Sequence, residues 1–242
     1  MKTSSFIFKL LFLPVFLIMP LFFNSCELLN EEGGLTEEQV IEGLKEALKV
    51  GTVNTVAETN QTDGYFGNAL IKIPFPQEAA TAENYIRNTL NLNSVVDEFI
   101  LKLNRAAEDA SIKAKPIFVD AIVNITITDA WNILKGQNNA ATTYLHDKTY
   151  TGLYNAFKPD INTSLSSVGA AQLWNSLTTQ YNNIANYSFG LLDPVNTDLP
   201  DYATSKALDG LFKLIEKEEE KIRIDPAARV TEILQKVFGE LD

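Results

Sequence analysis

Residues 206–223, KALDGLFKLIEKEEEKIR, carry the clearest helical pattern in the chain. Its apolar residues recur at intervals of three and four, so on a wheel of about 100° per residue they gather on one face around Leu208. This spacing predicts a long helix over 199–224 that buries the apolar face. Glu219 breaks the pattern, because it lies only about 20° from Leu208, in the middle of that face.

The same periodicity extends outward along the chain, and the alternation typical of strands is nearly absent. The sequence therefore predicts an all-α, single-domain bundle of about eight to nine helices. We expect the helices at 37–58, 76–91, 95–113, 116–125, 127–135, 140–168, 170–186, 199–224 and 226–238. The helix over 140–168 should kink or break at Pro159, which lacks a backbone donor and crowds the preceding turn.

Four of these helix starts carry capping signals. In each, a side-chain oxygen can accept a hydrogen bond from a backbone N–H group of the first turn. The signals are Thr36 with Gln39, Ser94 with Asp97, Thr126 with Asp129, and Asp225 before Pro226.

One stretch is expected to be extended, DGYFGNALIKIPFP at residues 63–76. Each proline there drives the preceding residue toward extended geometry. We interpret the stretch as a Pro-rich loop wrapped around the bundle and not as part of a sheet. Gly210, inside the helix 199–224, indicates that another backbone passes close to it.

The N-terminus has the order of a secretory signal. Lys2 and Lys9 supply a positive start, an apolar run over 10–23 follows, and Ser25 precedes Cys26. Residues 23–26, FNSC, resemble a bacterial lipobox, in which the cysteine is lipidated and becomes the first residue of the mature chain. An ordinary signal peptide that leaves an unpaired cysteine is the alternative.

Lipidation at Cys26 predicts three segments. They are a signal peptide at 1–25, a lipidated cysteine with a flexible tether at 26–35, and a helical domain at 36–239. Cleavage removes two lysines and no acidic residue, so the net charge falls from −11 to about −13. The membrane is then a partner through the anchor, and the expected location is the cell envelope, at the outer membrane of a Gram-negative bacterium.

Composition disfavours several kinds of chemistry. A net charge of −11 argues against nucleic acid as a partner, because its binding depends on clustered Lys and Arg. One Cys and one His cannot supply a zinc set, so no metal, cofactor or catalytic residue is assigned. The single histidine, His146, is expected at the surface or in packing, with no Ser or Cys motif beside it.

Two groups of polar residues are candidates for a site. Glu219 could end a solvated helix, form a buried ion pair with Arg223 or Arg229, or act as a functional acid. On the helix over 95–113, Asn104 lies near the border of the inward face and Arg105 points outward.

Arg105 is expected in an exposed ion-pair ladder with Glu98 and Glu108. Ligand binding, or a buried pair with a carboxylate such as Asp209, are the alternatives. The whole candidate cluster is Asn104, Arg105, Glu108, Lys115, Asp209, Glu219, Arg223 and Arg229.

Blocks along the whole mature chain resemble one bacterial group. They are IEGLKEAL (41–48), TDGY (62–65), IKIP (71–74), LNRAAE (103–108), AKPIF (114–118), KALDGLF (206–212), EEEKIR (218–223), DPAAR (225–229) and KVFG (236–239). In this order they resemble the exported proteins called domain of unknown function 4197. The resemblance implies a mainly helical, often lipid-anchored, uncharacterised protein and brings no catalytic residue.

Three functions stay open at this point. The first is a lipid-anchored, non-enzymatic binding or assembly module with an envelope protein or glycan partner. The second is a carboxylate-based hydrolase of envelope glycans, which needs a pocket with two carboxyl groups of opposed pKa shifts. The third is a carrier of an apolar ligand, which needs a large dry cavity.

Overall fold

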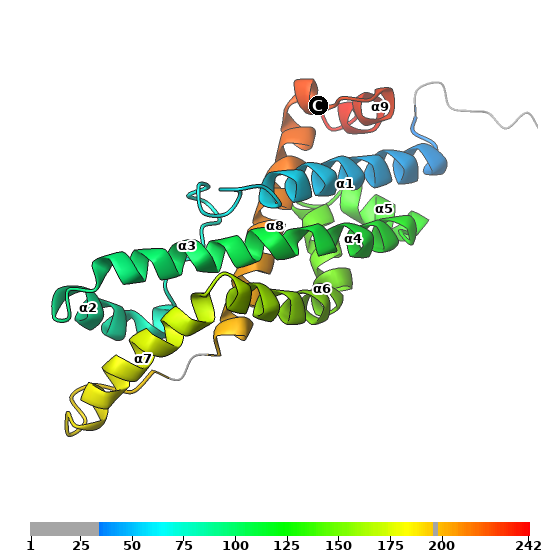
Figure 1. Cartoon of the computed structure of the whole chain (residues 1–242). Helices are drawn as coiled ribbons and strands as arrows, with labels where there is room; N and C mark the ends of the chain where they lie inside the picture. The colour runs from blue at the N-terminus through cyan, green and yellow to red at the C-terminus, as the bar shows by residue number, and fades with distance from the viewer. Residues whose placement is uncertain (1–33, 196–197) are drawn as a thin grey trace, which may run out of the picture. The chain divides into compact units, whose positions relative to one another are not determined.

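The computed structural model describes residues 34–195 and 198–242, and residues Leu35–Asp242 form one compact unit. Its α-helices are α1 (Glu37–Thr59), α2 (Ala80–Asn88), α3 (Asn93–Ala110), α4 (Ala114–Val123), α5 (Ile127–Leu134), α6 (Ala140–Ser167), α7 (Ala170–Asn186), α8 (Leu199–Ile224) and α9 (Glu232–Gly239) (Figure 1). Short 3₁₀ turns are η1 (Gln77–Ala79), η2 (Ser111–Lys113) and η3 (Pro226–Ala228). The described residues contain no strand, so the all-α prediction is confirmed.

Two of the expected caps are present. The Thr36 hydroxyl accepts from the Gln39 amide at 3.3 Å, and the Thr126 hydroxyl accepts from the Asp129 amide at 3.2 Å. In both, the second side chain accepts in return from the capping residue's own amide. These reciprocal boxes set the starts of α1 and α5.

Of the other two capping signals, Ser94 does not cap a helix, and Asp225 caps an element shorter than expected. Helix α3 begins at Asn93 without a side-chain cap, so Ser94 lies inside its first turn, and the Asp97 carboxylate accepts from the Arg87 guanidinium at 2.8 Å. Asp225 caps only the single turn η3. Three residues separate η3 from α9, which starts at Glu232 after a new cap, where the Thr231 hydroxyl accepts from the Leu234 amide at 3.4 Å. The expected helix 226–238 is therefore two elements.

Two other boundaries also differ from expectation. The range 76–91 contains η1 followed by α2, which ends at Asn88. Helix α6 continues through Pro159 without a break, and the Thr163 hydroxyl donates to the Pro159 carbonyl at 2.9 Å.

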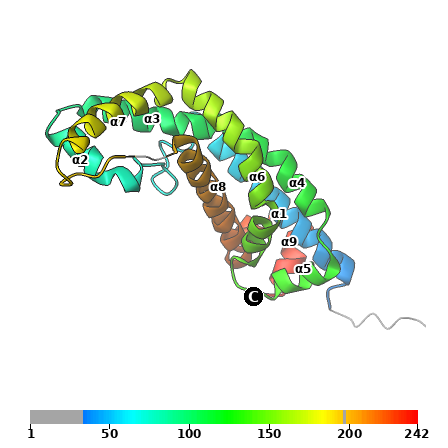
Figure 2. The ribbon, with the colours of Figure 1, turned by 90° about the horizontal axis from the view of Figure 1, so that it is seen from below.

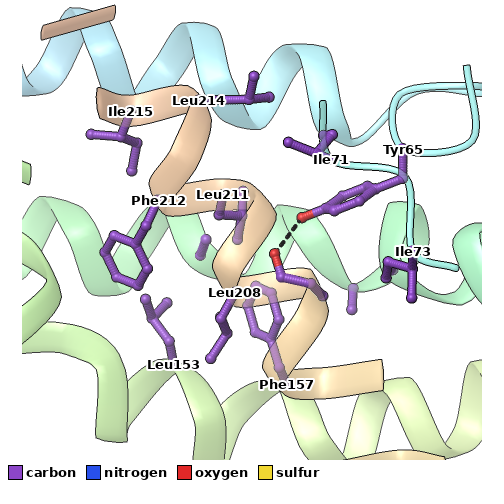
Figure 3. Packing of buried hydrophobic residues seen from close by; sticks show 14 of the residues in the cluster. Tyr65, Ile71, Ile73, Leu153, Phe157, Leu208, Leu211, Phe212, Leu214 and Ile215 are labelled. Atoms are coloured by element: carbon purple, nitrogen blue, oxygen red, sulfur yellow. Dashed lines mark hydrogen bonds between the residues drawn. The ribbon is translucent and has the colours of Figure 1, made fainter. Parts of the chain in front are cut away.

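Helix α8 is central to the packing of the unit. It lies against α6 on one side and α1 on another, while α1 also contacts α4, α5 and α9 (Figures 1 and 2). Helices α2 and α7 both pack against α3. Figure 3 shows Leu208 of α8 beside Leu153 and Phe157 of α6, and all three side chains are fully buried.

The loop between α1 and η1 closes over this core. The Tyr65 side chain is fully buried, and its hydroxyl donates to the Ala207 carbonyl of α8 at 2.7 Å (Figure 3). The Tyr202 hydroxyl donates to the Pro74 carbonyl at 3.2 Å. The stretch 63–76 is thus a wrapped loop, as its prolines predict.

None of the helices in the described part of the chain has by itself both the length and the apolar composition of a membrane span. Asn93–Val123 and Ile127–Leu134 reach that length and composition only when taken together, and the chain bends by 106° between them.

Candidate functional site

The Glu219 carboxylate is buried at the start of α6. The residue is 8% exposed, and it accepts hydrogen bonds from the Ala141 amide at 2.9 Å and from the Thr142 amide at 2.8 Å. The Thr142 hydroxyl adds a third, also at 2.8 Å. The first N–H groups of a helix have no partner within the helix, and the helix dipole favours a negative charge there. Glu219 therefore caps α6 from a different helix.

Arg223 lies one turn farther along α8 and caps the end of α5, the helix before α6. Its Nε atom donates to Glu219 Oε1 at 2.9 Å. Its Nη2 and Nη1 atoms donate to the carbonyls of Ile133 and Leu134 at 2.8 and 3.3 Å, at the end of α5. One ion pair on α8 therefore holds the end of α5 and the start of α6.

Of the three interpretations of Glu219, the buried ion pair with Arg223 is the one that the contacts fit. The carboxylate receives four hydrogen bonds, from two amides, one hydroxyl and one guanidinium. The cavity beside it measures about 10 Å³ and is lined mainly by apolar side chains. That volume is about one water molecule, so a substrate has no room next to Glu219.

Arg229 does not reach Glu219, although the sequence allowed that pairing. Its Nε and Nη2 atoms donate to the carbonyls of Ile222 and Arg223 at 3.0 and 2.9 Å, which closes the C-terminus of α8. Its Nη1 atom pairs with Asp242 at 2.6 Å. The hydrogen bond from Arg229 holds the pKa of the Asp242 carboxyl below its usual value.

Asn104 fixes the extended loop to α3. The side chain is fully buried; its Oδ1 atom accepts from the Ile73 amide, and its Nδ2 atom donates to the carbonyls of Ile73 and Ile100, each at 2.8 Å. All three hydrogen bonds join the Asn104 side chain to backbone groups of this chain. Asn104 therefore has a structural role, because it holds the loop against α3.

Glu108 holds the same loop one turn later. It is 5% exposed and accepts from the amides of Tyr65 and Phe66, both at 3.1 Å. Arg105 Nη1 donates to Glu108 at 2.6 Å, while its Nη2 donates to Asp63 at 2.7 Å. The Arg105 guanidinium therefore binds the loop directly, at Asp63, and also binds Glu108, the residue that holds the loop.

The expected ladder along α3 is only partly correct. Arg105 pairs with Glu108, but Glu98 faces Lys102 Nζ at 3.5 Å instead. A buried pair between Arg105 and Asp209 is wrong, because Asp209 is exposed and accepts from Lys206 at 2.9 Å.

The remaining sequence expectations concern three single residues. Lys115 is exposed on α4. A Cβ atom on Gly210 would lie 2.8 Å from Tyr65 Cε1 and 3.2 Å from Ile71 Cβ, so side chains, and not a backbone, approach this glycine. The His146 ring is half exposed and packs 4.9 Å from the Phe212 ring, as expected of a packing histidine.

The eight candidate residues thus do not form one site. Among the described residues, six of them hold backbone or loop segments in three separate places, and Lys115 and Asp209 lie at the surface. Sequence reasoning missed the partners Thr142, Tyr65 and Asp242. Their contacts are long-range or involve backbone groups, which carry no residue signature.

Hydrogen bonds from neighbouring side chains lower the pKa values of four carboxyl groups, Asp129, Asp201, Glu216 and Asp242. The general acid of a glycan hydrolase instead has a raised pKa. In the described ranges, no group of His, Cys, Asp and Glu could hold a metal ion.

A different feature stands out at the surface, in the loop between α7 and α8. Tyr187, Phe189 and Leu191 are 83%, 103% and 86% exposed. Phe189 has φ +52°, an uncommon backbone conformation for a bulky residue. We call Tyr187–Leu191 the tip loop. It is the most exposed apolar segment among the described residues.

Polar clamps hold the tip loop in shape. The Ser188 hydroxyl donates to the Ala185 carbonyl at 2.7 Å and accepts from the Leu192 amide at 3.0 Å. Asn182 binds both the amide and the carbonyl of Val195, at 2.8 and 3.0 Å. A signal for this feature exists in the sequence, because residues 161–192 contain no charged residue in a chain that is 21% charged.

Cys26, the residue expected to carry lipid, lies outside the described residues. Searches of curated proteins and of solved structures both return no match. A family model described as "Protein of unknown function (DUF4197)" matches residues 34–239, the whole helical unit apart from its last three residues. The chain therefore belongs to the DUF4197 family.

Proposed function

We propose that this protein is a lipid-anchored, non-enzymatic binding module of the cell envelope that engages a protein partner through its tip loop. The observation that carries the proposal is the group of three apolar side chains that the tip loop holds in solvent. Soluble proteins seldom expose such groups without an interaction site. Aromatic residues are also enriched where proteins meet.

The tip loop suits an uncharged contact. No charged residue lies between 161 and 192, so no charged side chain has to be dehydrated when this segment is buried against a partner. The clamps at Ser188 and Asn182 fix the loop before binding, which reduces the entropy lost on association. Both features support a preformed binding surface.

Two observations favour a binding module over the alternatives. The buried charged residues Glu108, Glu219, Arg223 and Arg229 are engaged with groups of this chain, which leaves them without the free positions that acid–base chemistry uses. The apolar cavity beside Glu219, about 10 Å³, is far smaller than the several hundred Å³ of a ligand pocket. A larger hollow of about 560 Å³ is open and lined by polar and charged residues such as Lys213 and Glu216, whereas a carrier of an apolar ligand would need an apolar lining.

The anchor rests on the sequence of residues 1–26. A positive start, an apolar run and a small residue before Cys26 support export and lipidation, with the outer membrane as the expected site. Cys26→Ala should move the protein from the membrane to the soluble fraction. If this variant stays on membranes after a carbonate wash, the lipid anchor is wrong.

The binding surface is tested with a photo-crosslinking residue placed at Phe189 in cells, and with a matched position, Asn175, on the exposed side of α7. We expect one discrete protein adduct from Phe189 and none from Asn175. With the crosslinking residue kept at position 189, the additional changes Tyr187→Ser and Leu191→Ser should abolish the same adduct without lowering the melting temperature, because both side chains are more than 80% exposed. Equal adducts at both positions would refute the tip loop as the surface.

A further inference from the structure

Helix α4 is apolar on two faces. Ala114, Phe118 and Ile122 point into the core and are at most 5% exposed. About 120° farther round the helix, Val119 and Val123 are 44% and 63% exposed. A second apolar face on a helix is normally covered, so this outer face of α4 lacks a partner among the described residues.

The outer residues form a continuous stripe. They are Ile112, Pro116, Val119 and Val123, and we call them the α4 stripe. On a wheel of 100° per residue these four residues fall within about 60° of one another, and they extend over about 16 Å of helix. Ile127 follows four residues after Val123, at the start of α5. Ile112 and Ile127 are 46% and 42% exposed.

The end of the stripe lies beside the beginning of α1. Lys45 Nζ donates to the Val123 carbonyl at 2.7 Å, and Lys45 is only about 12 Å along α1 from Glu37. Both views show the junction of α4 and α5 next to the N-terminal end of α1 (Figures 1 and 2). The stripe is therefore at the end of the helical unit where the chain from Cys26 arrives.

The place of the α4 stripe near the beginning of α1 indicates which surface the stripe contacts. Ten residues lie between Cys26 and Glu37, and the eleven Cα–Cα steps from one to the other span at most about 40 Å. A lipid anchor at Cys26 would hold a bilayer permanently within that distance, which gives it a high effective concentration at the stripe. The tip loop lies at the other end of the unit, beyond α7 (Figure 2).

The side chains around the stripe suit a lipid surface. Lys115 flanks it on one side, and Lys113 and Asp120 on the other, all exposed. Lysine side chains of this kind can lay their apolar stems along a membrane surface with the ammonium group at the headgroups. Only Asp120 is acidic among these three, in a chain with 31 acidic and 20 basic residues.

We propose that the α4 stripe rests in the interfacial layer of the membrane that carries the Cys26 anchor, and so orients the helical unit with its tip loop away from that bilayer. This inference rests on the proposed function, because it requires the anchor. The occupant is the lipid surface itself, bound by burial of the aliphatic side chains of α4.

The test uses the lipidated protein in vesicles of phosphatidylethanolamine and phosphatidylglycerol. Acylation consumes Cys26, the only cysteine, so one introduced cysteine can carry an environment-sensitive fluorophore. Val123→Cys reports on the stripe, and Asn183→Cys, exposed on α7, is the matched control. We expect a blue-shifted emission and quenching by lipid-borne quenchers at position 123, and a water-like emission at position 183.

Flotation of the vesicles separates the two proposals. If the protein floats with the vesicles and loses this ability with Cys26→Ala, but position 123 stays water-like, the stripe inference fails and the anchor stands. If the intact protein does not float, the anchor fails. A second variant, Val119→Asp with Val123→Asp, should still float but should lose the lipid contact, read from a fluorophore at Pro116→Cys. Retained quenching in that variant would overturn the inference.

Discussion

The Glu219 carboxylate and the Arg223 guanidinium lie 2.9 Å apart on α8, with side chains only 7% and 4% exposed. A buried ion pair does not by itself stabilise a fold, because removing two charges from water offsets their attraction. Here each partner also satisfies backbone groups at a helix end, Glu219 at α6 and Arg223 at α5. The pair is best understood as a connector of three helices.

Replacement of Glu219 should therefore destabilise the protein strongly. Glu219→Ala strands the Arg223 charge and two amide groups in the core, and we expect a loss of about 3–5 kcal/mol. Glu219→Gln should cost less, because its amide oxygen still accepts one of the hydrogen bonds. Urea unfolding followed by circular dichroism measures both changes.

Glu220 provides the matched control, since it is the next residue of α8 and is exposed. Glu220→Ala should change the unfolding free energy by less than about 0.5 kcal/mol. A Glu219→Ala midpoint equal to that of Glu220→Ala would contradict the connector role.

Gly210 tests the contact between α8 and the wrapped loop. Alanine is the better helix former by about 1 kcal/mol, but its Cβ atom would lie 2.8 Å from Tyr65 Cε1. Tyr65 cannot withdraw easily, because it is fully buried and its hydroxyl is bonded to Ala207. Gly210→Ala should therefore lower stability by about 1–3 kcal/mol, measured by thermal unfolding.

Gly152 in α6 is the control for this substitution. The nearest atom to an added Cβ there is Ile117 Cγ2 at 3.8 Å, an ordinary contact. Gly152→Ala should stabilise the protein by up to about 1 kcal/mol. If both alanine variants were stabilising, close packing at Gly210 would be refuted.

Stability should fall at alkaline pH through two buried tyrosines. Burial raises the pKa of the Tyr65 phenol, and it raises the pKa of Tyr202 to about 12, whereas an unfolded tyrosine ionises near pH 10. Above about pH 10 the unfolded chain loses protons that the folded chain keeps, so the contribution is complete below pH 10 and decreases as pH rises toward the folded pKa. Melting temperatures between about pH 8 and 12 follow this loss.

Tyr202→Phe should make the alkaline decline shallower, because one of the two buried phenols is gone. Tyr187→Phe is the control, since that side chain is 83% exposed. Identical slopes for the wild type and Tyr202→Phe would exclude Tyr202 as a source of the alkaline sensitivity.

Most helices could be predicted from the sequence because local signals determine them. Apolar spacing, and the capping boxes at Thr36 and Thr126, work within a few residues of each helix start. The predictions failed where a local signal met a competing one. Asp97 is used by Arg87, and the Asp225 cap supports only one turn before Thr231 starts α9.

The candidate residues could be found from sequence, but their roles could not. A carboxylate in an apolar stripe marks Glu219 as unusual. Its partners, the amides of Ala141 and Thr142, lie 78 and 77 residues away, and a backbone N–H group has the same chemistry in nearly every residue. The Asn104 clamp on Ile73 was missed for the same reason.

The connector on α8 also sets an order of events for a chain made or threaded N-terminus first. Helices α5 and α6 are complete in sequence by Ser167, yet the groups that cap their facing ends come from Glu219 and Arg223. Helix α1 likewise reaches its native packing only once α9 is present, because Val237 of α9 packs against Gly43 of α1. Contacts of such long sequence separation form late and slow folding. The first and last helices of the unit must therefore meet before α1 reaches its native packing, so the unit folds only after nearly its whole length has emerged.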